Sequence, residues 1–516
     1  MINKLIVGIL ASLILGACSF GNVTNLNETD TDAKIKFISA YNTTDIQEFL
    51  TSQIICKTGN DIDKCNKNKD NLAKQFNFNL DQIGKNNAIN KINAYTVVYQ
   101  TIGLKGEPRT VSGGILVPNT DKDKIKGIVL FYHPTDVSKF NMPSCFLNAQ
   151  NLPGYCHISN TVHGSVYVED LGGIFASQGY VVVMPDYIGQ GIDSSIMHPY
   201  IAFPRINAKT GIDMLPSVRQ LLKNLGFENS TRFAVFPTGY SEGGAYSLWA
   251  SKLLQNSEQS ILSDNNFSLG LTAPISGAYD LSGAQIPLQF ANVKTYPHAD
   301  KYKALATDEL TQIKPIVSTY YLTALAYYAM NKKFSEVFDT DYLNCGRFCK
   351  IGDEQYTITE LLNSTNPDLN VKNISSAINR DANDSINSAN NLAYGPDNNS
   401  ISSFTASGLQ KNKTFIKIAK QGDIVNWKTY KPVSFIALDY DSVVTPLNTA
   451  NAYNALKKSS DKNLIRKVSI SNFDYMTSIG KKDPNDLEPI DHMGCRVFLF
   501  IAALQEFNNY SIPTAQ

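Results

Sequence analysis

The chain has 516 residues, of which 43% are hydrophobic and 10% aromatic, and this composition suffices for a large apolar core. Its 46 basic residues balance 46 acidic ones, and no long basic run occurs, so the charge pattern gives no support for nucleic-acid binding. The length predicts one large decorated domain or a few ordinary ones of roughly 100–200 residues each.

Residues 1–17 have the pattern of an export signal and are not expected to belong to the fold. Lys4 gives a positive start, the apolar stretch Leu5–Leu15 follows, and a small residue precedes Cys18. Leu15-Gly16-Ala17-Cys18 resembles the processing site of a bacterial lipoprotein, which implies lipid on the Cys18 thiol and a membrane anchor. We therefore expect a location in the bacterial cell envelope, and Ser19 favours the outer membrane. The alternative is an ordinary secretory signal.

Export also makes disulfides plausible for the remaining cysteines. The simplest connectivity joins neighbours in the sequence, although the sequence alone does not prove it. The three pairs are Cys56 with Cys65, Cys145 with Cys156, and Cys345 with Cys349, and Cys495 is left over. Zinc binding at the last pair is the alternative, but no second pair of ligands lies nearby in the sequence.

Residues 18–91 are predicted to form a polar tether followed by a helical N-terminal extension, and we assign them no chemistry. Strand patterns begin at residue 92, where Ala94–Thr101 and Thr110–Val117 flank a turn that contains Gly-Glu-Pro. This arrangement is typical of a β-hairpin or a meander.

Further along the chain, apolar runs that suit buried parallel strands alternate with helical patterns. The expected strands are Gly127–Pro134, Gly179–Asp186, Phe233–Phe236, Leu269–Gly277, Pro432–Leu438 and Arg466–Ile470. The expected helices lie at 172–178, 212–225, 245–253, 449–457 and 494–507. Such alternation predicts an α/β fold with a mostly parallel central sheet. Residues 282–425 interrupt it and are predicted to be an inserted, mainly helical lid, so the core consists of residues 92–281 and 426–516.

The most informative motif is Gly239-Tyr240-Ser241-Glu242-Gly243, which lies between an apolar strand and a helical pattern. A Gly-x-Ser-x-Gly sequence at a sharp strand-to-helix turn is typical of a nucleophile elbow. Bulky neighbours would clash with the strand and the helix at such a turn, and the two glycines remove those clashes. The alternative is a glycine-rich turn that only packs.

Several stretches together resemble one known family. They are the Tyr-x-Thr strand with its Gly-Glu-Pro turn, Gly179-Tyr-Val-Val-Val-Met-Pro-Asp-Tyr-Ile-Gly189, His198-Pro199-Tyr200 and the elbow. Residues 92–281 and 426–510 resemble an α/β-hydrolase, and most of all bacterial esterases related to the fungal secretory lipases. The resemblance implies a serine hydrolase of this fold.

The resemblance also implies a catalytic triad in the order serine, acid, histidine. Ser241 is the expected nucleophile, and His492 is the expected base because it alone among the six histidines follows the last acid-bearing strand. Two carboxylates, Asp439 and Asp441, follow the strand that ends at Leu438. Related enzymes place the acid a few residues before Val-Pro, which favours Asp441 over Asp439.

Two backbone N–H groups are expected to form the oxyanion hole. One belongs to Glu242, the residue after the nucleophile. The family places the other after a His-Gly pair, but this chain has His133-Pro134, and a proline has no N–H to donate. Thr135 is therefore the expected second donor, and His133 is expected to hold the loop. His198-Pro199-Tyr200 is likewise expected to position groups of the site.

The sequence predicts no metal or cofactor. Asp170 and Asp186 are isolated carboxylates after strands, where loop hydrogen bonds are the commoner use, and no ligand cluster accompanies them.

Taken together, these residues predict a lipid-anchored serine hydrolase that cleaves carboxylic esters through an acyl-enzyme. Aromatic and apolar residues within 317–330 suit a pocket for an acyl chain, so the expected partner is a small ester or a lipid. Two alternatives stay open, a serine peptidase of the same fold and a non-catalytic lipoprotein that binds at the cell surface.

Overall fold

A computed structural model of the chain describes residues 34–50, 91–136, 171–286, 413–441, 443–472 and 495–510, residue 492, and single positions or short runs within 67–89, 139–156, 317–330 and 350–355. The strands are β1 Lys34–Asn42, β2 Lys91–Ile102, β3 Pro108–Asn119, β4 Gly127–Tyr132, β5 Tyr180–Pro185, β6 Phe233–Tyr240, β7 Phe267–Leu269, β8 Ala273–Ile275, β9 Lys350–Ile351, β10 Glu354–Gln355, β11 Val433–Leu438 and β12 Ile465–Ile470. The α-helices are α1 Thr43–Leu50, α3 Gly173–Ala176, α4 Pro204–Asn224, α5 Glu242–Leu254, α6 Gln259–Asp264, α14 Lys413–Gly422, α15 Pro446–Ser459 and α17 Arg496–Asn508.

A ten-stranded sheet runs through the molecule in the order β1-β2-β3-β5-β4-β6-β8-β11-β12, with β7 beside β6. The ladders that join β1, β2, β3 and β5 are antiparallel. All the ladders from β5 through β4, β6, β8 and β11 to β12 are parallel. The mostly parallel α/β sheet predicted from the sequence is confirmed. The parallel strands all end at the same edge, and residues that follow them are brought together there.

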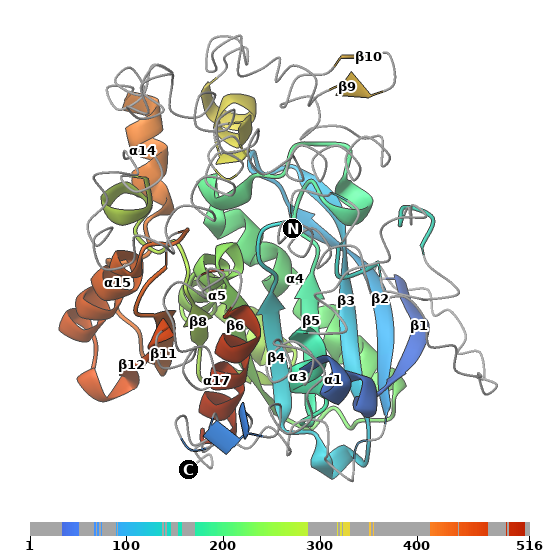
Figure 1. Ribbon diagram of the computed structural model, residues 1–516. Coiled ribbons are helices and arrows are strands. Elements are labelled where there is room, and N and C mark those ends of the chain that lie inside the picture. Colours follow the sequence, from blue (N-terminus) through green and yellow to red (C-terminus); the bar gives the residue numbers. More distant parts are fainter. Residues whose placement is uncertain are drawn as a thin grey trace, which may run out of the picture.

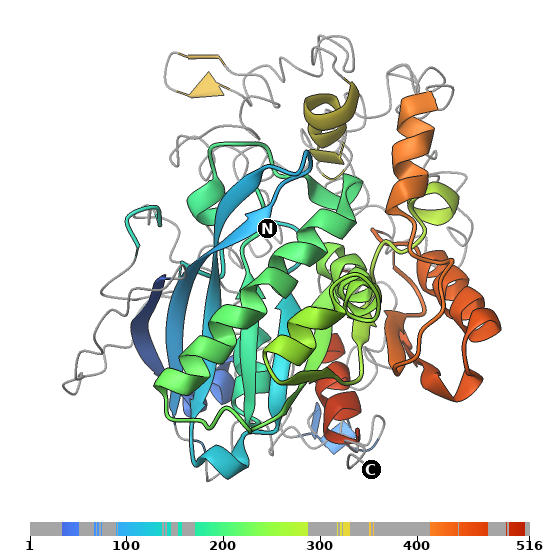
Figure 2. The same ribbon diagram turned by 180° about the vertical axis from the view of Figure 1, so that it is seen from behind.

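Helices cover both faces of this sheet, as Figures 1 and 2 show. Helices α3 and α17 pack with one buried apolar cluster. Helices α4 and α5 pack with a second cluster on the other face. Strands β4 and β5 are buried on both sides, which explains why they are apolar at every position; all six residues of each strand are buried.

Helix α4 begins at Pro204, well before the helical pattern that starts at Ile212. Its first turns bury small and polar residues, among them Asn207 and Gly211, so apolar spacing does not reveal them. A Cβ atom at Gly211 would lie 2.5 Å from the Tyr132 hydroxyl, so the glycine lets the helix approach β4 closely. The helix ends at Asn224, and Gly226, two residues later, has φ 82°, a backbone conformation that glycine adopts easily.

The N-terminal extension differs from its prediction. A helical extension was expected, but the structure adds an edge strand, β1, which pairs antiparallel with β2 before the short helix α1. Lys34, Ile35, Lys36 and Phe37 alternate between exposed and partly buried positions, which is the period of a strand with one covered face. The strand forms because β2 offers an unpaired edge far along the sequence, and local pattern does not report that partner.

Cys145 and Cys156 form the disulfide expected for that pair, with an S–S distance of 2.07 Å. Cys495 is buried and takes no part in a disulfide. The remaining cysteines lie outside the described residues: Cys18, Cys56, Cys65, Cys345 and Cys349. Within the part of the chain that the structure describes, no helix is long and apolar enough to span a bilayer.

Parts of the segment expected to form the lid lie beyond the edge at which the parallel strands end (Figure 1). They include the π-helix Ala326–Met330, the hairpin β9–β10 and helix α14. Tyr328 donates a hydrogen bond from its hydroxyl to the Met197 carbonyl, and thereby docks this segment on the core. The division of the chain into a core and a lid stays a prediction.

Candidate active site

Ser241 stands at the turn between β6 and α5, as the elbow motif predicts. Its backbone has φ 59° and ψ −116°, a conformation that a residue with a side chain seldom adopts. The Ser241 amide donates to the Ile275 carbonyl at 3.0 Å, and Gly244 donates back to the Ser241 carbonyl at 3.0 Å. These bonds hold the turn in its strained conformation at the C-terminal edge of the sheet.

Backbone atoms lie so close to the glycines around Ser241 that a Cβ atom at these positions would clash. A Cβ atom on Gly239 would lie 2.4 Å from the Gly243 carbonyl oxygen, and one on Gly243 would lie 2.0 Å from the Tyr132 carbonyl oxygen. A Cβ atom on Gly244 would lie 2.4 Å from the Ile275 carbonyl oxygen. Since backbone cannot yield as a flexible side chain can, residues with a Cβ atom do not fit at these positions.

The structure brings His492 and Asp441 together. His492 Nδ1 lies 2.7 Å from Asp441 Oδ2, and both side chains are buried. The second oxygen, Oδ1, accepts hydrogen bonds from the amides of Val443 at 3.0 Å and Val444 at 2.7 Å. The carboxylate is thus fixed by backbone donors on one side and presents its other oxygen to the imidazole.

Asp439, the alternative acid, lies elsewhere. Its side chain is exposed and accepts a hydrogen bond from the Asn472 amide at 2.9 Å. Its own amide donates to the Ile470 carbonyl at 2.9 Å, so the residue joins the ends of β11 and β12. The geometry therefore pairs the histidine with Asp441 and gives Asp439 a structural contact.

Tyr240 links the histidine to the elbow. Its ring stacks on the His492 ring with a centroid distance of 4.7 Å and an interplanar angle of 24°. Its hydroxyl donates to the His492 carbonyl. Because Tyr240 is the residue before Ser241, these contacts hold the imidazole beside the nucleophile turn.

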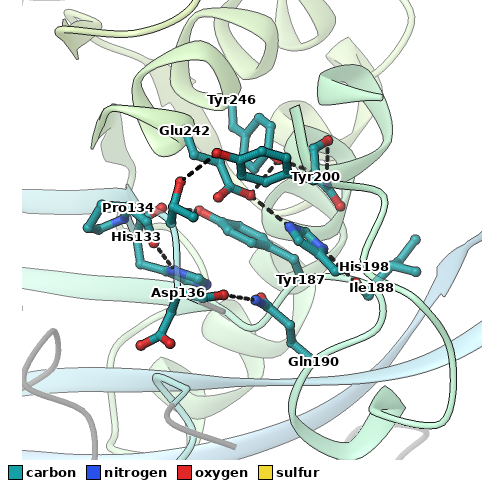
Figure 3. Close-up of polar contacts among 12 residues, drawn as sticks. His133, Pro134, Asp136, Tyr187, Ile188, Gln190, His198, Tyr200, Glu242 and Tyr246 are labelled. Atoms are coloured by element: carbon teal, nitrogen blue, oxygen red, sulfur yellow. Dashed lines mark hydrogen bonds and ion pairs between the residues drawn. The ribbon is translucent and has the colours of Figure 1, made fainter. Parts of the chain in front are cut away.

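Glu242, the residue after Ser241, has a buried side chain in a polar network that Figure 3 shows. Glu242 Oε1 lies 2.7 Å from His198 Nε2 and accepts a hydrogen bond from the Tyr246 hydroxyl at 2.6 Å. His198 Nδ1 lies 2.8 Å from the Ile188 carbonyl oxygen. Sequence reasoning assigned only the Glu242 backbone a role, and these side-chain contacts were missed.

The loop after β4 carries the second expected oxyanion donor. The ring of His133 bonds the neighbouring Pro134 carbonyl at 2.8 Å, and burial lowers the pKa of His133 to about 4, so the ring is neutral at pH 7. Tyr187 donates from its hydroxyl to the His133 carbonyl at 2.8 Å. Thr135 Oγ1 lies 3.1 Å from the Tyr200 hydroxyl. His133 therefore holds the loop, as expected.

Asp186 has the structural contacts expected of a loop carboxylate. It accepts hydrogen bonds from the Ser112 hydroxyl at 2.5 Å and from the Ser144 amide at 3.0 Å, and so ties the disulfide-bonded segment to the sheet. Burial raises the pKa of Asp186 to about 6. Asp170 lies outside the described residues. Among the described residues, no group of three or more His, Cys, Asp or Glu side chains could hold a metal ion.

A parallel sheet covered by helices, with a serine at a strained strand-to-helix turn at its C-terminal edge, is the architecture of the α/β-hydrolase fold. Residues 173–257, which run from α3 through the elbow and α5, match the family model of secretory lipases. The fold and this match support a hydrolase of the lipase and esterase type. A comparison with curated protein sequences finds no match.

Solved structures with the same architecture cover nearly the whole chain. The first is a protein of Legionella pneumophila solved as a proposed hydrolase, with a TM-score of 0.60 and 17% identity over 93% of this chain and 98% of that one. Another is the rice cell wall degrading esterase LipA from Xanthomonas oryzae, with a TM-score of 0.57 and 17% identity over 92% of this chain and 96% of that one. At such identities the likeness shows a shared fold.

Proposed function

We propose that the chain is a serine hydrolase that cleaves carboxylic esters. The observation that carries the proposal is the contact of His492 with Asp441 beside a serine in a strained elbow turn. A serine hydroxyl is a poor nucleophile until a base takes its proton, and the base needs a third group to fix its tautomer. Asp441 accepts a hydrogen bond from the N–H at Nδ1 of His492, which leaves Nε2 to act as the base.

The reaction follows from these roles. Ser241 Oγ attacks the acyl carbonyl and gives its proton to His492, and the carbonyl oxygen becomes an oxyanion that the backbone N–H groups of Glu242 and Thr135 stabilise. The carbon–oxygen bond to the alcohol then breaks, and His492 protonates the departing alcohol. Water, deprotonated by His492, attacks the acyl-enzyme and releases the acid, and the proton returns to Ser241.

We further propose that lipid on Cys18 anchors the enzyme in the bacterial cell envelope, at the outer membrane. The support is the sequence pattern before Cys18. The substrate is then a small ester or a lipid, with short to medium acyl chains favoured by the aromatic residues within 317–330. The esterase LipA of Xanthomonas oryzae, which has the same fold, acts in rice cell wall degradation, and an ester substrate agrees with that relative.

An activity panel tests the proposal. Esters with acyl chains of graded length and aminoacyl amides are compared for wild type and Ser241→Ala, with labelling by a fluorophosphonate probe as a second readout. We expect ester turnover and labelling that the substitution abolishes. Amide turnover above ester turnover would instead indicate a peptidase, and no turnover or labelling that depends on Ser241 would indicate a binding protein.

A further inference from the structure

Two side chains of the short segment His198-Pro199-Tyr200 contact the side chains of the residues whose backbone N–H groups are expected to form the oxyanion hole. His198 reaches the carboxylate of Glu242, and the Tyr200 hydroxyl reaches the side chain of Thr135. Glu242 begins α5 after β6, and Thr135 lies in the loop after β4, so one segment bridges two separate parts of the site. We infer that this segment positions the oxyanion hole, with His198 and Tyr200 as positioning residues. The inference rests on the proposed function, because it needs Ser241 to act as a nucleophile.

Backbone strain in the segment supports this role. Tyr200 has φ 50°, a value that a bulky residue adopts only when its surroundings impose it. Its carbonyl accepts a hydrogen bond from Asn207 at 3.2 Å, and its ring stacks on Tyr320 with a centroid distance of 4.6 Å. The conformation that directs the Tyr200 hydroxyl toward Thr135 is thus held from α4 and from the segment at 317–330.

His198 and Glu242 share one proton, which lies between Nε2 of the histidine and Oε1 of the glutamate. His198 Nδ1 faces the Ile188 carbonyl, which can only accept, so Nδ1 carries a hydrogen. His198 Nε2 lies 2.7 Å from Glu242 Oε1, and that gap must hold a second hydrogen because two bare acceptors would repel at this distance. The pair is therefore either imidazolium with carboxylate or imidazole with carboxylic acid. In both forms it has no net charge, which suits its burial.

The histidine and the tyrosines around the pair are neutral and do not take this proton. His133, from the loop after β4, is neutral at pH 7 because burial lowers its pKa to about 4. Burial raises the pKa of the tyrosines around the pair, so they too are neutral: Tyr200, Tyr246 and Tyr320. Tyr187 stacks between the rings of His133 and His198. Asp136, whose charge acts on Tyr320, is the further carboxylate on the loop after β4.

The contact with His198 therefore fixes the Glu242 carboxylate in a buried site, where its Oε1 lies 2.7 Å from His198 Nε2. Glu242 carries one proposed donor in its own backbone, so its displacement moves that N–H from the developing charge. A misplacement on the order of 1 Å costs roughly a hundredfold in rate.

Three variants test the inference through the kcat and KM of ester hydrolysis. Tyr200→Phe removes one hydroxyl and should lower kcat by about tenfold to a hundredfold with little change in KM, since a lost oxyanion donor costs roughly 10²–10³ and here the donor is only displaced. Tyr99→Phe is the matched control, because the Tyr99 hydroxyl bonds the Thr210 carbonyl at 2.9 Å and touches neither donor; its kcat should equal that of wild type.

Glu242→Gln separates positioning from packing. The amide can donate to His198 Nε2, so the contact survives. His198→Phe removes the contact and should lower kcat with little change in KM, and Glu242→Gln should lose less kcat than His198→Phe. The thermal midpoint of each variant shows whether it is folded, and Tyr200→Phe remains decisive if another variant does not fold.

The outcomes distinguish the two levels of the proposal. Retention of turnover in Ser241→Ala would overturn the proposed function. Loss of turnover in Ser241→Ala, with wild-type kcat in Tyr200→Phe or a kcat loss in Glu242→Gln as large as in His198→Phe, would overturn only the positioning inference.

Discussion

Replacement of Asp441 by asparagine is the sharpest test of the proposed triad, because the surrounding donors dictate how the new side chain must lie. The amides of Val443 and Val444 both point at Oδ1, so the asparagine must turn its carbonyl oxygen toward them. Its NH₂ group then faces His492 Nδ1, which lies 2.7 Å from Oδ2 in the wild type. Two donors cannot face each other, so Nδ1 must give up its hydrogen and Nε2 must carry it.

A histidine with its proton on Nε2 cannot take the proton of Ser241. The expected loss is about 10⁴-fold in kcat, as for a triad carboxylate elsewhere, which corresponds to about 5.4 kcal/mol of activation free energy. The assay is hydrolysis of p-nitrophenyl butyrate at saturating substrate. Asp439→Asn is the matched control: its oxygen can still accept from Asn472, and an exposed substitution costs about twofold or less. A larger loss for Asp439→Asn, or a loss under about tenfold for Asp441→Asn, would refute the reasoning.

Three further predictions concern the anchor, the cysteines and stability. Cys18→Ala should abolish incorporation of radiolabelled palmitate and leave the protein soluble or unprocessed, and unchanged labelling would exclude the anchor. Non-reducing peptide mapping should find Cys56 bonded to Cys65 and Cys345 to Cys349, and a disulfide to Cys495 would contradict this. Burial raises the pKa of Asp186 from 3.8 to about 6, so the stabilisation is full below pH 3.8 and is lost as the pH rises through about 6. The loss is on the order of 3 kcal/mol, and Asp186→Asn should flatten the fall of Tm between about pH 4 and 6; an equal slope would place the titration elsewhere.

The strands and the elbow could be predicted because their causes are local. A strand buried on both faces must be apolar throughout, and β4 and β5 are. A Cβ atom on Gly239 would meet the Gly243 carbonyl within the same turn, so the motif itself reports this crowding, whereas a Cβ atom on Gly243 would meet the Tyr132 carbonyl at the end of β4. The parallel sheet then follows from the alternation of strands and helices, and the position of Ser241 follows from the sheet.

What escaped prediction depends on partners that are distant in the sequence. β1 forms against β2, and the chain between them gives no sign that the two will pair. The side chains of His198 and Glu242 are in contact, although nothing in the sequence around either residue indicates this contact. Even Asp441 was favoured over Asp439 only by resemblance to related enzymes, whereas the distance to His492 gives the physical reason.

The early start of the sheet sets how far the enzyme could work from a membrane. β1 begins at Lys34, so with a lipid on Cys18 only the residues between these two positions would connect the sheet to the membrane. Even at full stretch such a length of chain reaches roughly 55 Å, at about 3.3–3.6 Å per residue. An enzyme tethered in this way would act on esters in the bilayer surface or in the narrow layer beside it, and it would meet free substrates only when they diffuse into that layer.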